Sequence, residues 1–342
     1  YEQLGKHITA GAGFLSNFVL WNEAGYFDNS SETKPLLHLW SLGIEEQFYI
    51  IWPVLLWLSW KRKFNLLIIT IVIALTSLVL NLIGIKEDAI ATFYSPITRF
   101  WEVLTGSLLA WFSLFKVVEI TKIKNKIDNY LRIIFHKGKQ IDNYSPLANF
   151  FSLLGFIILA YGFLVINKEL NFPGKWAILP VIGATFLIMA GPKALINRKI
   201  LSNKILVWFG LISFPLYLWH WPLLSFARII EQEILTLNIR FIAVIISVFL
   251  AWLTYCLIEL PIRKGNSTNS IVTILLILII SIGYFGYNTY KNGGHEFRFI
   301  NKLNSGVNKA LSYNWNKAFR YDECVIDAID EKTNKFSKQG NL

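Results

Sequence analysis

The residues best suited to chemistry gather in one short segment between Pro35 and Pro53. On a helix, His38, Ser41 and Glu45 would follow one another at spacings of three and four residues and so share one face. Ionisable groups are costly inside an apolar segment, so their presence there indicates a functional site by default. An imidazole beside carboxylates can take up, hold and release a proton, which serves catalysis as well as transport.

The depth of the carboxylates in this segment limits the interpretations. Glu45 would lie about 10 Å below His38 along the helix, and Glu46 and Gln47 follow it directly. Two adjacent carboxylates at that depth cannot both face lipid, so we expect at least one of them to face a polar cavity or a partner. A structural alternative stays open, in which His38 and Glu46 lie at the outer membrane interface and extend toward water.

Other polar residues interrupt apolar sequence further along the chain. Tyr217 and His220 stand three residues apart and can face inward together. A lone histidine among aromatic residues is more often structural than catalytic, so this segment alone favours a structural role. Arg99 and Glu102 are spaced for a structural ion pair within one helix, and Gly106 permits another helix to approach closely.

The remaining motifs add little chemistry. Glu259 and Arg263, at a predicted helix end, are typical of an anchor at the membrane interface. The sequence has no metal-ligand spacing, glycine-rich phosphate loop, nucleophile elbow or redox motif, and Cys256 and Cys324 indicate neither a metal site nor a disulfide framework. The residue pattern alone therefore predicts a polar intramembrane site that serves catalysis, transport or neither.

The elements that must position these residues are membrane-spanning helices. Of the 342 residues, 54% are hydrophobic and only 16% are charged, against roughly a quarter charged in soluble domains. This composition excludes a soluble globular enzyme, a disordered chain and a disulfide-rich mini-protein. We expect an all-α, polytopic integral membrane protein with about nine transmembrane helices. The apolar stretches lie near residues 8–21, 37–60, 64–83, 96–115, 147–166, 176–191, 205–227, 240–260 and 271–290.

The charges between these stretches predict the orientation. The net charge is +11, and every second gap is basic, including 61–63 and the long gap 116–146. This alternation follows the positive-inside rule, so the basic residues indicate cytoplasmic loops and we expect no nucleic-acid partner. The rule places Tyr1 in the cytoplasm and the tail after Tyr290 outside.

The segment 16–53 resembles the membrane acyltransferase-3 family, and more narrowly the bacterial O-acetyltransferases that modify O-antigen and other cell-envelope glycans. The residues that carry this resemblance are Ser16, Asn17, Trp21, Gly25, Tyr26, Phe27, Asp28, Pro35, His38, Trp40, Ser41, Glu45, Glu46, Gln47, Phe48, Tyr49, Trp52 and Pro53. Later matches keep the family's order, and they are Arg99–Glu102 with Gly106, Ser213–Pro222 and Glu259–Arg263.

The resemblance implies an acyltransferase for groups other than aminoacyl groups. Such an enzyme takes an acyl group, commonly acetyl from acetyl-CoA, on the cytoplasmic side and delivers it to a sugar hydroxyl on the outer face. Acetyl-CoA would be a donor substrate, with no permanently bound cofactor. The expected location is the bacterial inner membrane, and the expected partners are the lipid bilayer and a glycan or lipid-linked glycan such as lipopolysaccharide O-antigen.

The resemblance also implies a domain plan. Residues 1–290 would form the acyltransferase-3-like transmembrane domain, and 291–342 would be an extracytoplasmic linker toward an SGNH-hydrolase-like domain. The family's presumed catalytic histidine and its Arg-x-x-Arg motif belong to two helices that we expect upstream of Tyr1. Residues 1–342 alone are therefore expected to be inactive.

The resemblance leaves supporting roles for residues of this chain. Glu45 would orient or charge-stabilise the principal histidine, and Glu46 and His38 would line the glycan-facing mouth. The residues expected to contact the acceptor or the bound acyl group are Ser41, Tyr217 and His220. An alternative of a different class is a polytopic transporter or flippase without covalent chemistry, although the sequence lacks the two related halves typical of many transporters.

Overall fold

The fold is helical throughout the part of the chain that the structure describes. The computed structural model describes residues 1–25, 30–136, 145–167, 169–231, 235–265 and 268–294, and no strand occurs among them. The motif residues Tyr26, Phe27 and Asp28 and nearly all of the predicted linker 291–342 lie outside these ranges.

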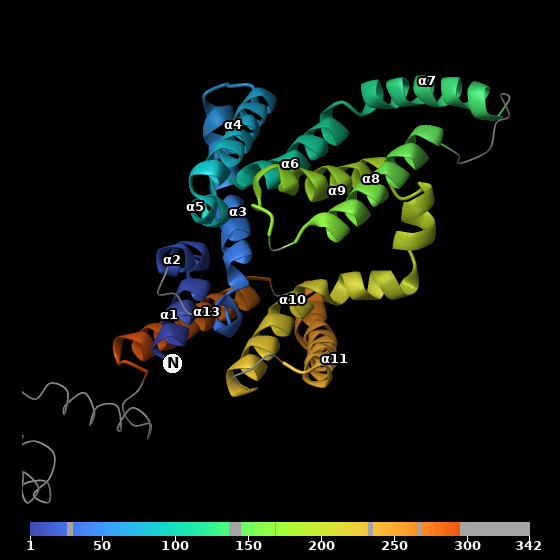
Figure 1. Cartoon of the computed structure of the whole chain (residues 1–342). Helices are drawn as coiled ribbons and strands as arrows, with labels where there is room; N and C mark the ends of the chain where they lie inside the picture. Colours follow the sequence, from blue (N-terminus) through green and yellow to red (C-terminus); the bar gives the residue numbers. More distant parts are fainter. Residues whose placement is uncertain (26–29, 137–144, 168, 232–234, 266–267, 295–342) are drawn as a thin grey trace, which may run out of the picture. The chain divides into compact units, whose positions relative to one another are not determined.

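The helices follow one another with short connections (Figure 1). The α-helices are α1 (Glu2–Ala12), α2 (Ser16–Glu23), α3 (Leu39–Lys61), α4 (Leu66–Glu87), α5 (Ala89–Tyr94), α6 (Phe100–Phe115), α7 (Val117–His136), α8 (Pro146–Val165), α9 (Ile178–Ala190), α10 (Lys204–Glu231), α11 (Leu237–Thr254), α12 (Leu260–Lys264) and α13 (Thr268–Lys291). Short 3-10 or π-helical turns are η1 (Ser31–Thr33), η2 (Gly174–Ala177), η3 (Asn197–Leu201) and η4 (Tyr255–Glu259).

The chain divides into two compact units. The smaller unit consists of Tyr1–Thr9 and the chain from Tyr284 onward. Within it, the start of α1 and the end of α13 approach closely at two glycines. A Cβ added at Gly5 would lie 2.7 Å from the carbonyl oxygen of Gly286, so only a residue without a side chain fits this contact.

The larger unit, Ala10–Gly283, contains the residues of the predicted site. Its α8 and α9 pack so tightly that a Cβ at Gly155 would lie 2.7 Å from the Gly183 carbonyl oxygen. The prediction for Gly106 was wrong, because an added Cβ there would meet no described atom within 4 Å. The close helix approach therefore occurs at Gly155 and Gly183 instead.

The segment that carries the predicted site is anchored by apolar packing. Phe48 of α3, Ala74 of α4 and Leu104 of α6 form a buried cluster, against which Trp52 and Phe100 pack. Phe48 and Trp52 lie one turn apart and stack at 5.7 Å between ring centroids. These contacts fix the rotation of α3 about its axis, and therefore the direction in which its polar residues point.

The structure supports a polytopic membrane protein, but a count of nine spans is not confirmed. By length and composition, five described helices can cross a bilayer, or six if a bent pair counts as one span. The five correspond to the predicted stretches 64–83, 147–166, 205–227, 240–260 and 271–290. The other four predicted stretches do not form a single long apolar helix. The stretch 8–21 contains two short helices, and α3, in 37–60, carries several polar residues. In 96–115, α6 is bent away from the helix that follows it, and α9, in 176–191, is short.

The long basic gap 116–146 also differs from the predicted loop. Residues 117–136 form the helix α7, which begins directly after α6 and makes an angle of 91° with it (Figure 1). Apolar residues at helical spacing alternate with lysines along this segment, which favours a helix with two unlike faces. The basic charges thus lie on a regular element.

Candidate functional site

Four of the predicted site residues meet where α3 and α10 face each other. The Ser41 hydroxyl lies 2.6 Å from the Tyr217 hydroxyl, and Tyr217 also donates a hydrogen bond to the backbone carbonyl of His38. The ring centroids of His38 lie 5.1 Å from Tyr217 and 6.0 Å from His220. Two imidazoles and two hydroxyls, from segments far apart in sequence, thus form one cluster.

His38 is the most deeply buried member of this cluster. Only 6% of its surface is exposed, and its ring interacts with the backbone of Leu218 on α10. The Nδ1 of His220 lies 3.0 Å from the Leu216 carbonyl oxygen one turn earlier. Imidazoles so placed can bind a substrate hydroxyl or move a proton.

Further contacts hold the loop before α3 against α10. The Trp221 indole nitrogen donates to the Lys34 carbonyl oxygen at 2.9 Å, and Arg228 forms an ion pair with Glu32. Lys34 is itself buried, with its ammonium 3.1 Å from a Glu23 carboxylate oxygen. These contacts position His38, which precedes the first residue of α3.

The two predicted carboxylates lie outside the hydrogen-bonded cluster. Glu45 is exposed and Glu46 is half-buried. Among the described residues, neither carboxylate has a hydrogen bond or an ion pair. Glu45 and Glu46 lie on α3 itself, whereas His38 is the residue that precedes this helix.

A polar contact that the sequence interpretation did not single out involves the next residue, Gln47. Its side-chain amide donates to the Phe14 carbonyl oxygen at 2.7 Å and to the Asn17 amide oxygen at 2.9 Å. Asn17 is fully buried and donates to the Tyr94 carbonyl oxygen at 3.1 Å. Phe14 has a φ of 56°, a conformation that is rare for a side-chain-bearing residue and is stabilised here by tertiary contacts. Gln47 and Asn17 therefore join α2, α3 and α5.

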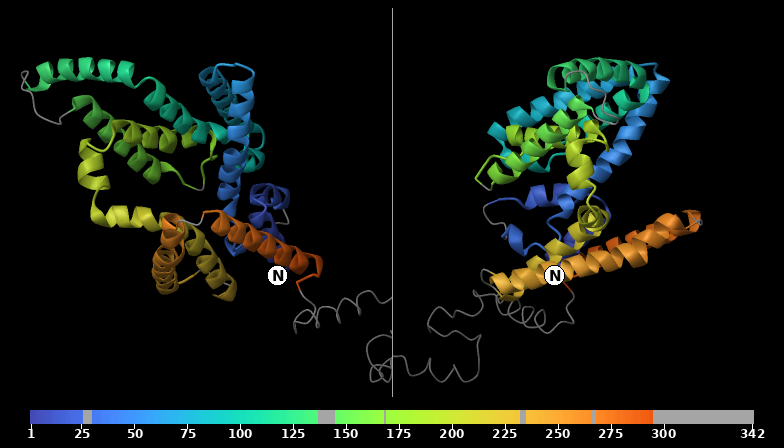
Figure 2. Two further views of the ribbon diagram at one scale, coloured as in Figure 1. Left: turned by 180° about the vertical axis from the view of Figure 1, so that it is seen from behind. Right: turned by 90° about the vertical axis from the view of Figure 1, so that its right-hand side faces the viewer.

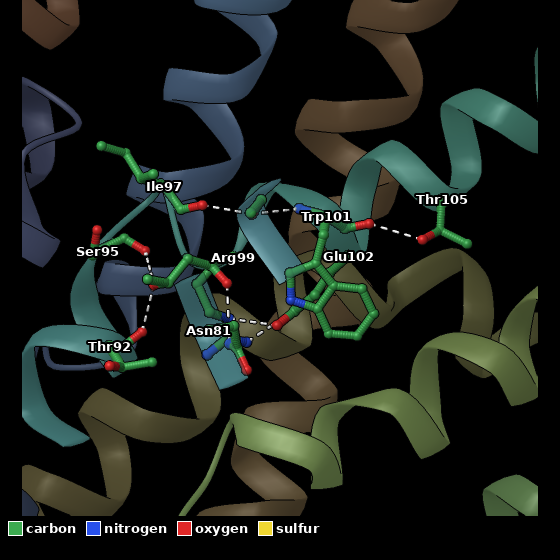
Figure 3. Close-up of polar contacts among 10 residues, drawn as sticks. Asn81, Thr92, Ser95, Ile97, Arg99, Trp101, Glu102 and Thr105 are labelled. Atoms are coloured by element: carbon green, nitrogen blue, oxygen red, sulfur yellow. Dashed lines mark hydrogen bonds and ion pairs between the residues drawn. The ribbon is translucent and has the colours of Figure 1, made fainter. Parts of the chain in front are cut away.

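Arg99 and Glu102 form an ion pair at the start of α6 (Figure 3). Arg99 Nε lies 2.6 Å from one carboxylate oxygen of Glu102, and Nη2 donates to the other at 3.0 Å. The guanidinium carbon also lies 5.2 Å from the ring centroid of Trp40 and 5.5 Å from that of Phe172. Trp40 directly precedes Ser41 in the chain. Arg99 and its ion pair therefore lie against the residue that is next in sequence to a member of the histidine cluster.

The same close-up shows how the polypeptide before α6 is held. The Ser77 hydroxyl of α4 donates to the Ile97 carbonyl oxygen at 2.5 Å and accepts from the Trp101 backbone amide at 3.1 Å (Figure 3). Asn81, one turn further along α4, donates to the Thr98 carbonyl oxygen at 3.0 Å. These bonds satisfy backbone groups that would otherwise be costly within a membrane.

The last predicted motif forms a local ion pair only. Arg263 Nη2 lies 2.6 Å from a carboxylate oxygen of Glu259, four residues earlier. Among the described residues, this pair forms no hydrogen bond or ion pair with the histidine cluster. Nor do those ranges hold a group of three or more histidine, cysteine, aspartate or glutamate side chains that could bind a metal ion.

Two cavities lie near these elements. Helix α10 packs against α11 (Figure 2). One cavity, of about 290 Å³, is lined by Ser31, Glu32, Trp221, Leu224, Ser225, Arg228, Leu235 and Arg240. The other, of about 200 Å³, lies between α7 and the ends of α8 and α9, and its charged lining residues are Lys124, Asp128, Arg132 and Lys193. The first is mainly apolar, whereas the second is basic and suits an anionic group.

A family model described as an acyltransferase domain matches residues 5–256, which is most of the chain. The chain belongs to the acyltransferase-3 family. The matched acyltransferase-3 region includes every described member of the histidine cluster, and the family assignment agrees with the resemblance that segment 16–53 carries.

Relatives with known names give the same assignment. The chain is 32% identical over 273 residues to a Staphylococcus aureus (strain COL) protein provisionally named an O-acetyltransferase, covering 76% of this chain and 41% of that protein. It is 31% identical over 264 residues to peptidoglycan O-acetyltransferase OatA of Listeria monocytogenes, covering 75% of this chain and 40% of OatA. An uncharacterized Haemophilus influenzae protein is 34% identical over 203 residues, which cover 55% of this chain and 71% of that protein. The chain thus spans about two fifths of the length of the named acyltransferase-3 relatives, and no solved structure matches it.

Proposed function

We propose that this chain is the membrane part of an O-acyltransferase that transfers acetyl from acetyl-CoA to a hydroxyl of a cell-envelope glycan. The observation that carries the proposal is that one acyltransferase-family match spans both sides of the histidine cluster, His38 with Ser41 on α3 and Tyr217 with His220 on α10. A packing role alone would not require two imidazoles and two hydroxyls between apolar helices.

The proposed reaction makes one ester and breaks one thioester. The glycan hydroxyl loses its proton to a base, its oxygen attacks the thioester carbonyl carbon, and the C–S bond breaks to release CoA, whose sulfur takes up a proton. Charge develops on the carbonyl oxygen during the attack and needs a hydrogen-bond donor. The resemblance assigns the principal base to a histidine outside these residues. In this proposal, His38 and His220 hold or pass protons near the acceptor, and Ser41 and Tyr217 bind hydroxyl or carbonyl oxygens.

The carboxylates have separate roles in the proposal. Glu45 charge-stabilises or orients the principal histidine, because a neighbouring carboxylate favours the imidazolium that forms during proton transfer. Glu46 lies beside it, toward the glycan-facing mouth that His38 also lines. The half-buried position of Glu46 and the exposed position of Glu45 are compatible with contacts to further parts of the protein or to substrate.

For the donor, we propose that basic residues of segment 116–146 meet the CoA phosphates. Lys124 and Arg132 of α7 line the basic cavity together with Lys193, and cations arranged around a small cavity suit phosphate oxygens. Arg99 is a poorer candidate, because its guanidinium pairs with Glu102 and lies against the rings of Trp40, Phe93 and Phe172, and the predicted orientation puts it near the outer side.

The names of the relatives support a glycan hydroxyl as the acceptor in this proposal. One relative is named as acting on peptidoglycan, whereas the resemblance of segment 16–53 points to O-antigen. We propose a cell-envelope glycan hydroxyl, with lipopolysaccharide O-antigen as the first candidate. The bacterial inner membrane is the proposed location, because acetyl-CoA is cytoplasmic and the envelope glycan is outside.

The test uses the protein expressed from its complete reading frame in a host that lacks the gene. Cells are grown with isotope-labelled acetate, O-antigen and peptidoglycan are purified separately, and alkali-labile acetyl esters on each are measured by mass spectrometry. The proposal predicts labelled ester on one of these glycans, and the glycan that carries it identifies the acceptor. Membrane-inserted protein without any new ester would overturn the proposal, and movement of unmodified lipid-linked glycan would favour the transporter alternative.

A further inference from the structure

Helix α7 has an apolar stripe that no described part of the chain covers. Ile120, Ile123, Ile127 and Tyr130 recur at spacings of three and four residues, so they share one face. All four are exposed, with Ile123 at 60% and Tyr130 at 68%. Such a stripe on a helix in water would be costly, because each large apolar side chain loses burial free energy when it is left exposed.

The composition of α7 rules out a conventional span. Its 20 residues include Lys122, Lys124, Lys126 and Arg132 together with two acidic residues. Charges at the centre of a spanning helix are strongly unfavourable. A helix with one apolar face and one strongly charged face instead lies in the plane of the membrane interface.

The direction of α7 agrees with an in-plane position. The preceding helix α6 has 16 apolar-rich residues, and their rise of about 24 Å would cover most of the hydrocarbon core if the helix stood steeply in the bilayer. The angle between α6 and α7 is 91°. A helix perpendicular to a steeply inserted helix runs parallel to the bilayer surface.

A pair of hydrogen bonds also indicates that the middle of α7 lies at the membrane surface. Asp128 accepts hydrogen bonds from the Leu147 backbone amide at 2.8 Å and from the Ser145 hydroxyl at 2.6 Å. These residues are the start of α8, which is one of the candidate spans. The carboxylate also stabilises the positive end of the α8 dipole. Since Asp128 is 4% exposed and faces α8, it fixes the rotation of α7 and leaves the apolar stripe turned away.

We infer that α7 is an interfacial helix that lies on anionic phospholipids in the leaflet where α8 begins. Ile120, Ile123, Ile127 and Tyr130 enter the acyl-chain boundary, and Lys122 and Lys126 meet headgroup phosphates beside them. Both lysines are exposed and lie on the side of the helix away from Asp128. Lysines close to an anionic lipid surface are attracted to it electrostatically. This inference does not depend on the proposed acetyl transfer.

The test measures where single side chains of α7 lie in the bilayer. The full chain, with Cys256→Ser and Cys324→Ser, is purified and reconstituted into vesicles of phosphatidylcholine with phosphatidylglycerol at about 3:1. Nitroxide labels are attached at Ile123→Cys, Ile127→Cys or Tyr130→Cys and, in separate variants, at Lys122→Cys or Lys126→Cys. Collisions with oxygen, which concentrates in lipid, are compared with collisions with a water-soluble nickel chelate. Ile157→Cys, at an exposed position midway along the span α8, is the reference for acyl-chain depth.

The expected result is a helical alternation. Labels at 123, 127 and 130 should collide mainly with oxygen, at a depth shallower than Ile157→Cys, and labels at 122 and 126 mainly with the nickel chelate. Nickel accessibility at all five positions would overturn the inference, since α7 would lie in water. Low accessibility to both reagents at 123, 127 and 130 would also overturn it, because another protein surface would then cover the stripe.

A change of lipid tests the part of the inference that concerns charge. In vesicles of phosphatidylcholine alone, the labels at 123 and 127 should become measurably shallower, while Ile157→Cys stays unchanged. Equal depth in the two compositions would overturn the assignment of Lys122 and Lys126 to anionic headgroups. Five variants are used so that a folding defect in one of them does not decide the result.

Discussion

The Ser41 and Tyr217 hydroxyl oxygens lie 2.6 Å apart although 176 residues separate them in the chain. Tyr217 also bonds to the backbone of His38, so one phenol joins α10 to the start of α3. The two prolines of α10, Pro215 and Pro222, flank this contact. Because proline removes a helical hydrogen bond, α10 is able to deviate locally where it meets α3. The phenol thus connects Ser41 and the backbone of His38 to α10.

Tyr217→Phe should lower acetyl transfer at least about tenfold, which corresponds to roughly 1.4 kcal/mol of transition-state stabilisation. The substitution removes the bonds to Ser41 and to the His38 carbonyl while keeping the aromatic ring. The measurement is ester formation on the purified glycan at matched membrane levels. Tyr161→Phe, on an exposed tyrosine of α8, is the control and should have no effect. Full activity of Tyr217→Phe would contradict a role of the Tyr217 hydroxyl, and of the contacts it makes, in acetyl transfer.

Glu45→Gln should abolish acetylation in the complete protein while leaving membrane levels normal. Glutamine keeps the size and polarity of the side chain but cannot stabilise an imidazolium by its charge. The carboxylate makes no bond within the described residues, so folding should be unaffected. Glu87→Gln, on an exposed residue near the end of α4, provides the control for loss of one charge. Unchanged activity of Glu45→Gln would contradict its proposed role.

Arg99→Met should destabilise the protein by about 3–5 kcal/mol, because it leaves the mostly buried Glu102 carboxylate without its partner. The double variant Arg99→Met with Glu102→Leu should recover much of this loss. The stability of the single and the double variant is measured by heating each in detergent and monitoring the loss of monodisperse protein. If the double variant is no more stable than the single one, the cost lies in the aromatic cage around Arg99 rather than in the ion pair.

Gly155→Ala should separate α8 from α9 and lower the thermal unfolding temperature. Its Cβ would lie 2.7 Å from a backbone oxygen, closer than real contacts allow. Gly210→Ala is the matched control, since an added Cβ there meets no described atom within 4 Å and alanine favours helix by about 1 kcal/mol. Equal unfolding temperatures for the two variants would show that the α8–α9 contact is looser than described.

The predicted orientation can be checked through the two cysteines. In a Cys256→Ser variant, Cys324 of the tail should react with a membrane-impermeant maleimide in cells whose outer envelope has been permeabilised, because the positive-inside rule places the tail outside. A cysteine introduced at Lys122 should react only after lysis. Labelling of Lys122→Cys in unlysed cells, without labelling of Cys324, would reverse the orientation.

The sequence by itself determined the class of protein and the family. Apolar composition and run length predict membrane helices because the hydrocarbon core excludes unpaired backbone groups, and the ordered motifs of segments 16–53, 99–106 and 213–222 carry the resemblance that the family match bears out. The i, i+3 spacing also brings Arg99 and Glu102 within reach of each other. Local rules of this kind need no knowledge of which helices are neighbours.

Only the tertiary structure decided which elements meet. Helix spacing could not pair Ser41 with Tyr217, nor reveal that Gln47 bonds to Phe14 and Asn17. It also misassigned the close helix approach to Gly106 rather than Gly155, and it treated 117–136 as a loop. The reason is physical: inside a bilayer all apolar faces are equally well solvated by lipid, so partners are chosen by shape and by a few polar contacts between distant residues.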